Sequence, residues 1–395
     1  MSVIQSGTTI FTYSDAVQYV LDAHAVDSTS LNRRHARAAV LKAYRDLPSR
    51  HDWTYFYRQR LLHTVASYTT GTVVFDFTGG TNERMLTLTT GTWPSWATFG
   101  RVIIDGTHYE VEDRKSNSII TLTETSNPGQ DVASTTFTIY RNSYPLPADF
   151  KEFSDDGVWD ISGNYALNFV DQREQHNALV AFYNTPSTPT HATVRATGKY
   201  LGGLELILGP PPNDDLTYDL LYQARPRPLA IEEYCNGTVT VTASDETVTG
   251  VAAVFPPNCA GAIIRLSSGT AKPSGSLGSV DGVDNPPVLQ AVIESRTDDT
   301  HLELTDVADT TYSTGVGYTI SDPLDIEPGA MLTALLHAAE AEFSRLAGRQ
   351  DANAKYALAN RSLLEGMEAD SHVRNTGRAP YNRQLGLLRA TVTND

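Results

Sequence analysis

The side chains that most often carry out chemistry in proteins are few and scattered in this 395-residue sequence. Its ten histidines stand singly, without Cys or Asp at metal-ligand spacing, and its two cysteines, Cys235 and Cys259, are too few for a zinc site. The sequence patterns of phosphate-binding loops, dinucleotide-binding loops, zinc proteases and hydrolase nucleophile elbows do not occur. We therefore predict no catalytic residues, no cofactor and no metal, in a reducing compartment.

Three weaker chemical patterns leave alternatives open. The acidic turn at residues 155–160 offers oxygen ligands, but it lacks the alternating ligands and closing Glu of a calcium loop, so we interpret it as a solvated turn. An acid/base pair among the 46 Asp and Glu residues stays open, because such pairs meet only in the fold. Tryptophans such as Trp93, Trp96 and Trp159 would suit a sugar-stacking surface, although packing uses aromatic side chains more often.

Charge is unevenly distributed along the chain. The 30 Lys and Arg residues against 46 Asp and Glu give a net charge of −16, which repels polyanions such as nucleic acid. Residues 33–60 nevertheless hold eight Lys or Arg against two Asp, and residues 371–394 hold four Arg and no acidic residue. This segregation predicts two basic segments that dock on an acidic partner or on a neighbouring copy.

Apolar residues recur at helical spacing at both ends of the chain. Near the start, Ser14 or Asp15 is expected to cap a first helix, and residues 31–47 to form a second, which Pro48 ends. Near the end, Gly348 is expected to separate two further helices. Because helices come from both chain ends, we predict that they pack together.

Two Thr- and Val-rich stretches, 67–140 and 236–321, show the alternation and the Gly and Asn breaks of antiparallel strands. Similar short segments follow one another in the same order in both, which indicates an internal repeat. The matched segments are Gly71-Thr72-Val73 with Gly237-Thr238-Val239, Trp93-Pro94 with Phe255-Pro256, Ile120-Thr121-Leu122-Thr123 with Leu302-Glu303-Leu304-Thr305, and Phe137-Thr138-Ile139 with Tyr318-Thr319-Ile320. Between the stretches, strands at 192–197, 203–208 and 217–223 predict a small sheet.

These patterns predict an α+β fold. We expect an α-helical bundle core built from both chain ends plus a small sheet, with two inserted antiparallel units that resemble β-barrels or sandwiches. The expected division is 1–66 for the N-terminal helical part of the core, 67–140 for the first β insertion, 141–235 for the central mixed part, 236–321 for the second β insertion, 322–370 for the C-terminal helices and 371–395 for a basic docking tail.

Five segments stand out by their order along the chain. They are Leu47-Pro48-Ser49-Arg50 with Trp53, Tyr144-Pro145-Leu146-Pro147-Ala148-Asp149-Phe150, Leu206-Ile207-Leu208-Gly209-Pro210-Pro211-Pro212, Leu221-Tyr222-Gln223-Ala224-Arg225-Pro226-Arg227-Pro228-Leu229, and a closing Ala-rich helix pair. In this order the chain resembles the head-to-tail adaptor, or neck, proteins of tailed bacteriophages. The resemblance covers most of the chain outside the two β stretches.

The resemblance implies a non-enzymatic virion protein of the neck or tail, assembled in the host cytoplasm. Copies, typically twelve, would form a ring below the portal protein, join a downstream tail or nozzle protein and let genomic DNA pass, without contact to a membrane. The C-terminal segment of the family commonly reaches the portal, so we expect it to dock there through Arg374, Arg378, Tyr381, Arg383, Leu385, Leu388 and Arg389. The alternatives are a tail-tube or tail-tip protein and a glycan-binding or glycan-degrading virion protein.

Overall fold

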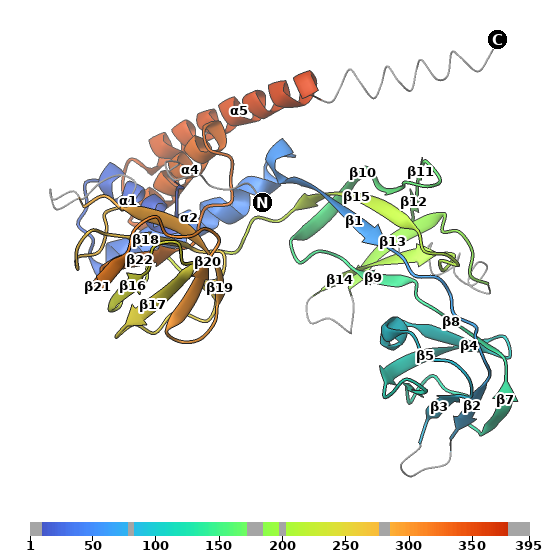
Figure 1. The fold of residues 1–395 in the computed structure, drawn as a ribbon. Coiled ribbons are helices and arrows are strands. Elements are labelled where there is room, and N and C mark those ends of the chain that lie inside the picture. Colours follow the sequence, from blue (N-terminus) through green and yellow to red (C-terminus); the bar gives the residue numbers. More distant parts are fainter. Residues whose placement is uncertain (1–9, 78–82, 172–184, 197–202, 276–284, 378–395) are drawn as a thin grey trace. The chain divides into compact units, whose positions relative to one another are not determined.

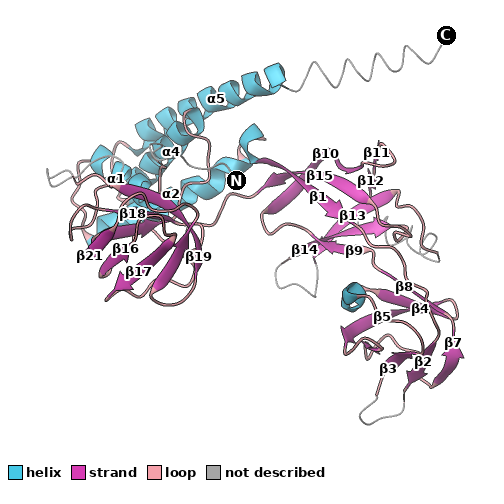
Figure 2. Cartoon of the chain, viewed as in Figure 1, coloured by secondary structure: helices cyan, strands magenta, loops and turns pink. Residues whose placement is uncertain are grey.

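The computed structural model describes residues 10–77, 83–171, 185–196, 203–275 and 285–377. The chain divides into two compact units (Figure 1). Met1–Tyr55 and Pro226–Asp395 make up the helical unit, and Phe56–Arg225 makes up the strand unit. The α-helices of the described residues all lie in the helical unit, and the short helical turn that Figure 2 draws in the strand unit is a 3₁₀ helix, Ser95–Phe99. The predicted mixed α+β class is confirmed. None of the helices in these ranges combines the length and apolar composition needed to cross a membrane.

The helical unit contains α1 (Tyr13–Ala23) and α2 (Ser30–Asp46) from the N-terminal part, and α4 (Ala330–Leu346) and α5 (Ala352–Gly377) from the C-terminal part. Each of α1, α2 and α4 buries a stripe of apolar residues at three- and four-residue spacing. Helix α2 packs on α4, and α4 packs on α5. Gly348 has a φ of +66°, a conformation that glycine adopts without strain, and it lies between α4 and α5 as predicted.

The cap of α1 differs from the prediction. The N-cap is Thr12, whose hydroxyl accepts a hydrogen bond from the backbone N–H of Asp15, while the Asp15 carboxylate accepts one from the backbone N–H of Thr12. Asp15 is therefore the third residue of a capping box and not the cap itself, and Ser14 lies inside the helix. The pattern Thr-x-x-Asp is visible in the sequence and is the signal that the prediction missed.

Each Thr/Val-rich stretch forms a seven-strand sheet with the same strand order, β7-β2-β3-β6-β5-β4-β8 in the strand unit and β21-β16-β17-β20-β19-β18-β22 in the helical unit. The last two strands of each stretch are separated by one residue, and they pair with the two opposite ends of the remaining sheet. The two end strands of each sheet thus follow one another in the chain, so each sheet curves back on itself and is nearly closed; we refer to the two sheets as barrels. The strands are β2 (Val73–Asp76), β3 (Met85–Leu88), β4 (Arg101–Ile104), β5 (Thr107–Arg114), β6 (Ile119–Leu122), β7 (Val132–Thr135), β8 (Phe137–Tyr140), β16 (Thr238–Val241), β17 (Thr247–Val251), β18 (Ile263–Leu266), β19 (Leu289–Arg296), β20 (His301–Leu304), β21 (Tyr312–Val316) and β22 (Tyr318–Ser321).

The two barrels also place equivalent residues at equivalent positions in their cores. The rings of Trp93 and Phe137 meet edge to face with centroids 5.0 Å apart, and those of Phe255 and Tyr318 do so at 5.9 Å. These are residues that the sequence alignment of the two stretches matched. Further equivalent contacts are the backbone bridges Tyr68–Ile139 and Tyr234–Ile320, and the hydrogen bonds from Arg114 to the Trp93 carbonyl and from Arg296 to the Phe255 carbonyl.

The rest of the strand unit is a sandwich of two four-stranded sheets, in the orders β1-β15-β10-β11 and β12-β13-β14-β9. One apolar cluster contains residues from both sheets, including Tyr144, Leu206, Tyr218 and Tyr222. The strands are β1 (Tyr57–His63), β9 (Ser143–Pro145), β10 (Phe150–Asp160), β11 (Tyr165–Ala166), β12 (Asn168–Phe169), β13 (His191–Ala196), β14 (Leu204–Gly209) and β15 (Thr217–Ala224).

This arrangement corrects the prediction of one small sheet that belongs to the helical core. The three predicted strands correspond to β13, β14 and β15, but β15 pairs with β1 and β10, whereas β13 and β14 belong to the other sheet. Strand β1 comes from the segment assigned to the N-terminal helical part, and its pairing with β15 joins that segment to the strand unit.

Candidate functional site

The predicted docking residues lie at and beyond the end of α5. The helix continues past residue 370 to Gly377, and residues 371–376 contain no Pro or Gly that would end it. The predicted docking tail, 371–395, therefore does not begin at the end of a helix: its first seven residues, 371–377, still belong to α5. Arg374 lies in the last turns of α5. The other predicted residues, Arg378, Tyr381, Arg383, Leu385, Leu388 and Arg389, lie outside the described residues.

Asp370 ties the end of α5 to the N-terminal part of the chain. Its side chain is 3% exposed, accepts the backbone N–H of Thr54 at 2.9 Å and contacts Nε2 of His51 at 3.0 Å. One turn earlier, Gly366 lies against the Trp53 ring, where a Cβ would be 3.3 Å from Cη2. Trp53 is itself buried and donates its indole N–H to the carbonyl of Leu47 at 3.0 Å. Helix α5 is thus fixed up to the beginning of the arginine-bearing segment.

A second polar cluster joins α2, α4 and α5 around Glu342. Its side chain is 5% exposed and accepts hydrogen bonds from Lys42 at 2.9 Å, from Tyr356 at 2.7 Å and from the Arg345 guanidinium. Burial alone would raise the pKa of Glu342, but the hydrogen bonds from Arg345, Tyr356 and Lys42 outweigh it and lower the pKa to about 2. The carboxylate is therefore a permanently ionised structural acceptor in the physiological pH range.

A cavity of about 130 Å³ lies beside this cluster, between α2, α4 and α5. Alanine and leucine side chains make up its apolar wall, and the polar wall includes Lys42, Glu342 and Tyr356. Lys42 and Tyr356 both donate to Glu342, so these three polar groups are engaged with one another and not with the cavity. The polar lining is completed by Asp46, Arg50 and Asn360. We interpret the cavity as a gap in the packing of the three helices.

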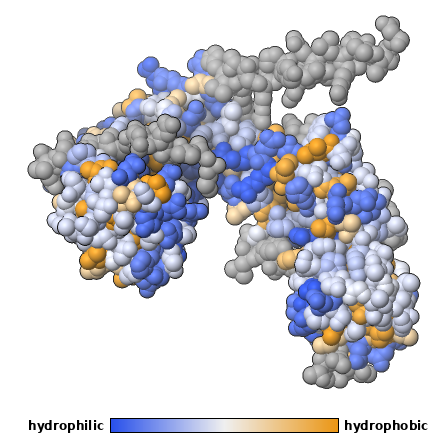
Figure 3. Space-filling view, in the orientation of Figure 1, coloured by the Kyte–Doolittle hydropathy of each residue, from blue (hydrophilic) through white to orange (hydrophobic). Residues whose placement is uncertain are grey.

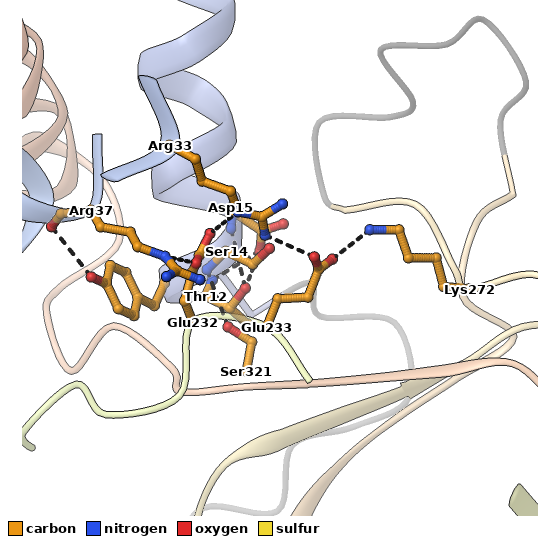
Figure 4. A network of polar contacts seen from close by, with 10 residues as sticks. Thr12, Ser14, Asp15, Arg33, Arg37, Glu232, Glu233, Lys272 and Ser321 are labelled. Carbon is orange, nitrogen blue, oxygen red and sulfur yellow. Dashed lines mark hydrogen bonds and ion pairs between the residues drawn. The ribbon is translucent and has the colours of Figure 1, made fainter. Parts of the chain in front are cut away.

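Figure 4 shows a polar network that joins α1 and α2 to the β16–β22 barrel. Arg33 reaches both Glu232 and Glu233 at 2.7 Å; Glu232 also pairs with Arg37, and Glu233 pairs with Lys272 at 2.8 Å. Burial would raise the pKa of Glu233, but hydrogen bonds from Lys272 and Arg33 outweigh it, so the pKa is lowered. Three residues of the basic segment 33–60 (Arg33, Arg37 and Lys42) are thus paired within the chain.

A buried ion pair lies next to this network. Arg265 of β18 and Asp15 of α1 have side chains that are 5% and 0% exposed, and the two guanidinium nitrogens reach the two carboxylate oxygens at 3.0 and 2.8 Å. Such a bidentate pair fixes orientation as well as distance. Sequence reasoning missed it, since 250 positions separate the partners and neither belongs to a recognisable motif.

The tryptophans expected for a sugar-stacking surface do not gather on one exposed face. Trp93 is fully buried in the first barrel and donates its indole N–H to the carbonyl of Ser118 at 3.0 Å. Trp96 packs against the same core, and only Trp159 of these three is substantially exposed, at 39%. A glycan-binding surface would need exposed tryptophan rings, and Trp93 is not exposed.

The interpretation of residues 155–160 as a solvated turn is wrong, because they lie at the end of strand β10. Asp160 is 1% exposed and accepts backbone hydrogen bonds from Ser162 and Gly163, both at 2.8 Å.

Cys259 and His24, two of the side chains that could act as nucleophiles or ligands, are buried in the fold. Burial raises the pKa of the Cys259 thiol and lowers the pKa of the His24 imidazole, which packs on the Phe343 ring. Within the described ranges, no three His, Cys, Asp or Glu side chains are grouped to hold a metal ion. The side chains of residues 155 and 156 lie outside the description.

No family model matches the chain, and no curated protein matches it.

Proposed function

We propose that the protein is a structural connector of a tailed-bacteriophage virion, a head-to-tail adaptor. In this proposal copies assemble in the host cytoplasm into a ring, dodecameric as the resemblance implies, below the portal protein. The ring joins the capsid to a downstream tail or nozzle protein and forms part of the channel for the genome. In each copy the helices from both chain ends form the core together with the β16–β22 barrel, and the β2–β8 barrel belongs to the strand unit with the sandwich.

The observation that best supports the proposal is that α5 is held in place by buried contacts close to its C-terminal end. The helix is fixed by Asp370, Gly366 and the Glu342 cluster, and it leads directly into residues 378–395, which carry Arg378, Arg383 and Arg389. A rigid helix that ends in an arginine- and leucine-bearing segment suits capture of an acidic groove on a neighbouring protein, because arginine forms bidentate, charge-assisted hydrogen bonds. The basic residues Arg33, Arg37 and Lys42 are already paired, so the C-terminal segment is the better candidate for that role.

The charge of the β stretches agrees with passage of DNA. Residues 67–140 hold four basic and eight acidic residues, and residues 236–321 hold three and ten. Acidic surfaces offer no phosphate neutralisation, so a genome would slide past them without binding. A tail-tube or tail-tip protein would share this property, and electron microscopy of labelled particles separates the two roles by position along the virion.

Deletion of residues 378–395 tests the proposal. The deletion keeps α5 and its Asp370 contacts, so the shortened chain should fold with an unchanged circular dichroism spectrum. We expect it to lose co-sedimentation with portal-bearing capsids. A chain with Arg361→Ala, which removes an exposed arginine of the same helix, is the matched control and should bind as the parent does. Undiminished binding after the deletion would refute docking through this segment.

A further inference from the structure

The sheet of β1, β15 and β10 has one face toward the sandwich core and one face away from it. Tyr218 and Leu220 of β15 lie on the core face, and each is at most 3% exposed. Side chains alternate between the faces along a strand, so Asp219 lies on the opposite face. In the strand register, Leu61 of β1 and Trp159 of β10 both pair with Asp219. These three side chains form one row across the face that points away from the core.

This face carries large apolar side chains in contact with solvent. Leu61 is 60% exposed, Trp159 is 39% exposed, and Ile161, which follows directly on β10, is 50% exposed. Figure 3 shows apolar residues at the surface of the strand unit around β10 and β11. The solvent side of an antiparallel sheet is usually polar, and grouped apolar residues there mark an interaction site. We name Leu61, Asp219, Trp159 and Ile161 the outer sheet face.

Asp219 gives the outer sheet face a specific chemical requirement. Its Oδ2 accepts a hydrogen bond from Nε2 of Gln59 at 2.5 Å, while its Oδ1 is shielded from solvent and has no hydrogen-bond partner among the described residues. A shielded carboxylate oxygen without a donor is costly, so the Asp219 carboxylate would be stabilised by a positive charge placed beside it. A cation also suits the position because the neighbouring Trp159 ring attracts cations.

Helix α2 of the helical unit has an exposed side with the matching chemistry. Leu31, Arg34, Ala38, Leu41 and Arg45 follow at steps of three and four residues, which places them on one face of the helix. Leu31 is 53% exposed, Arg34 and Arg45 are exposed, and neither arginine forms an ion pair with any described residue. We name these five residues the α2 stripe. It offers leucines to an apolar surface and two free guanidinium groups to an acceptor.

We propose that the outer sheet face binds the α2 stripe of a second copy of the chain. The leucines cover Leu61 and Ile161, and an arginine of the stripe pairs with the Asp219 carboxylate from the solvent side and stacks on Trp159. The two surfaces are different and lie on different compact units of the chain, so the contact is heterologous. A heterologous contact that repeats around an axis generates a ring. The inference rests on the proposed function and names the interface that would build its ring.

A first experiment removes the apolar part of the contact. Leu61→Glu and Trp159→Glu are compared with Val254→Glu, an equally exposed position at 61% in the helical unit. The full chain is measured by mass photometry over a range of concentrations, and melting temperature verifies folding. We expect the concentration for half-assembly to rise about tenfold or more for the two outer-face variants. The Val254→Glu chain should assemble as the parent does.

A second experiment exchanges the charges. Asp219→Arg places like charges opposite each other, and so does Arg34→Asp combined with Arg45→Asp, so each variant alone should fail to assemble. An equimolar mixture of the two variants should assemble again. In that mixture one interface pairs the arginine introduced at position 219 with an aspartate introduced on the α2 stripe, and the next interface is unchanged from the parent. Asp113→Arg, at a side chain of β5 that is 50% exposed, changes the net charge by as much as Asp219→Arg does and should leave assembly intact.

The outcomes separate this inference from the proposed function. If the parent chain forms rings and the outer-face variants do so equally well, the interface is wrong and the ring stands. If the charge variants are restored only when combined in one chain, the two surfaces meet within a copy, and the inference fails. If the parent remains monomeric at every concentration and on portal-bearing capsids, both the ring and this interface are refuted.

Discussion

At the scale of single residues, much of the charge that the sequence offers to partners is used inside the fold. Arg33 and Arg37 hold the buried Glu232, Lys42 holds Glu342, and Arg265 holds Asp15. Of these pairs, Arg265–Asp15 is buried on both sides, and removing one of its partners would cost on the order of 3–5 kcal/mol, because an unpaired charge stays in a poorly solvated place. Arg33, Arg37 and Lys42 are partly exposed, so solvent screening makes their pairs weaker. These contacts therefore secure the helices to one another and to the second barrel.

Glu342 gives a pH-dependent prediction at this scale. Its pKa is about 2 in the folded chain, below the ordinary value of 4.5 for the free side chain. A lowered folded-state pKa stabilises the fold above pH 4.5, and the contribution is lost as the pH falls toward 2. We expect Glu342→Gln to lower the free energy of unfolding at pH 7 by about 2 kcal/mol, since hydrogen bonds to a charged acceptor are lost.

Urea unfolding at pH 7 and at pH 3 checks this expectation. The difference between the parent and Glu342→Gln should shrink at the lower pH. Glu365→Gln, on the exposed side of α5, is the control and should cost no more than about 0.5 kcal/mol at either pH. An equal difference at both pH values would show that the Glu342 carboxylate does not titrate as described.

At the scale of elements, the two barrels share a strand order but differ where a helix docks. Arg265 in the second barrel pairs across strands with Thr319, and the equivalent position in the first barrel is Ile103, which pairs with Thr138. Only the second barrel meets α1 through a buried ion pair with Asp15. The two barrels thus share the same strand order, but at one equivalent position only the second barrel has an arginine, Arg265, which binds α1.

The residue between the last two strands gives a prediction at the element scale. In the second barrel it is Gly317, where a Cβ would lie 2.2 Å from the carbonyl oxygen of Ala271 and 2.7 Å from that of Thr270. Because both neighbours are backbone atoms, Gly317→Ala must displace the chain and should cost about 2 kcal/mol or more. Hydrogen exchange of the β21 and β22 amides measures the loss. Thr136→Ala at the equivalent, exposed position of the first barrel should be nearly neutral.

Helices and strands could be predicted from the sequence where their signals lie within a few neighbouring residues. Helical spacing, Gly348 and the paired Thr/Val-rich stretches place helices and strands close to their observed bounds, because these signals act over a few residues. The pairing of β1 with β15 and the contact between Asp15 and Arg265 could not be predicted, since each joins segments more than 150 residues apart. For the same reason the outer sheet face is visible only in the strand register.

At the scale of the whole molecule, the chain divides differently from the expected division. The central part, 141–235, was assigned to the helical core, but residues 56–225 form a compact unit with two apolar clusters of their own. The sequence could not show this, because the strand β1 that completes the sandwich is separated from β15 by the entire first barrel. For the candidate site, the sequence indicated the arginine-bearing C-terminal segment. It did not indicate the contacts of Asp370, Gly366 and Glu342 that hold α5 in front of this segment.

The contiguity of the strand unit gives a prediction at this scale. A fragment of residues 56–225 should fold by itself, with a cooperative thermal transition and dispersed NMR amide signals. A fragment of residues 67–225 lacks β1, which exposes the β15 edge and uncovers part of the cluster around Tyr222, so it should melt at a clearly lower temperature. An unfolded 56–225 fragment, or equal melting of both fragments, would contradict the autonomy of this unit.

The near-closure of the barrels has a consequence for crowding. Unpaired strand edges are templates for uncontrolled sheet growth between molecules, and a sheet that closes on itself has no such edge. Many copies held side by side can thus bring their barrels into close proximity without merging them into a shared, insoluble sheet. In the described part of the chain the sandwich sheets are the fully open ones, with β1, β11, β9 and β12 at their edges, whereas the two end strands of each barrel follow one another in the chain. Fibrous misassembly of this protein would therefore start from the sandwich.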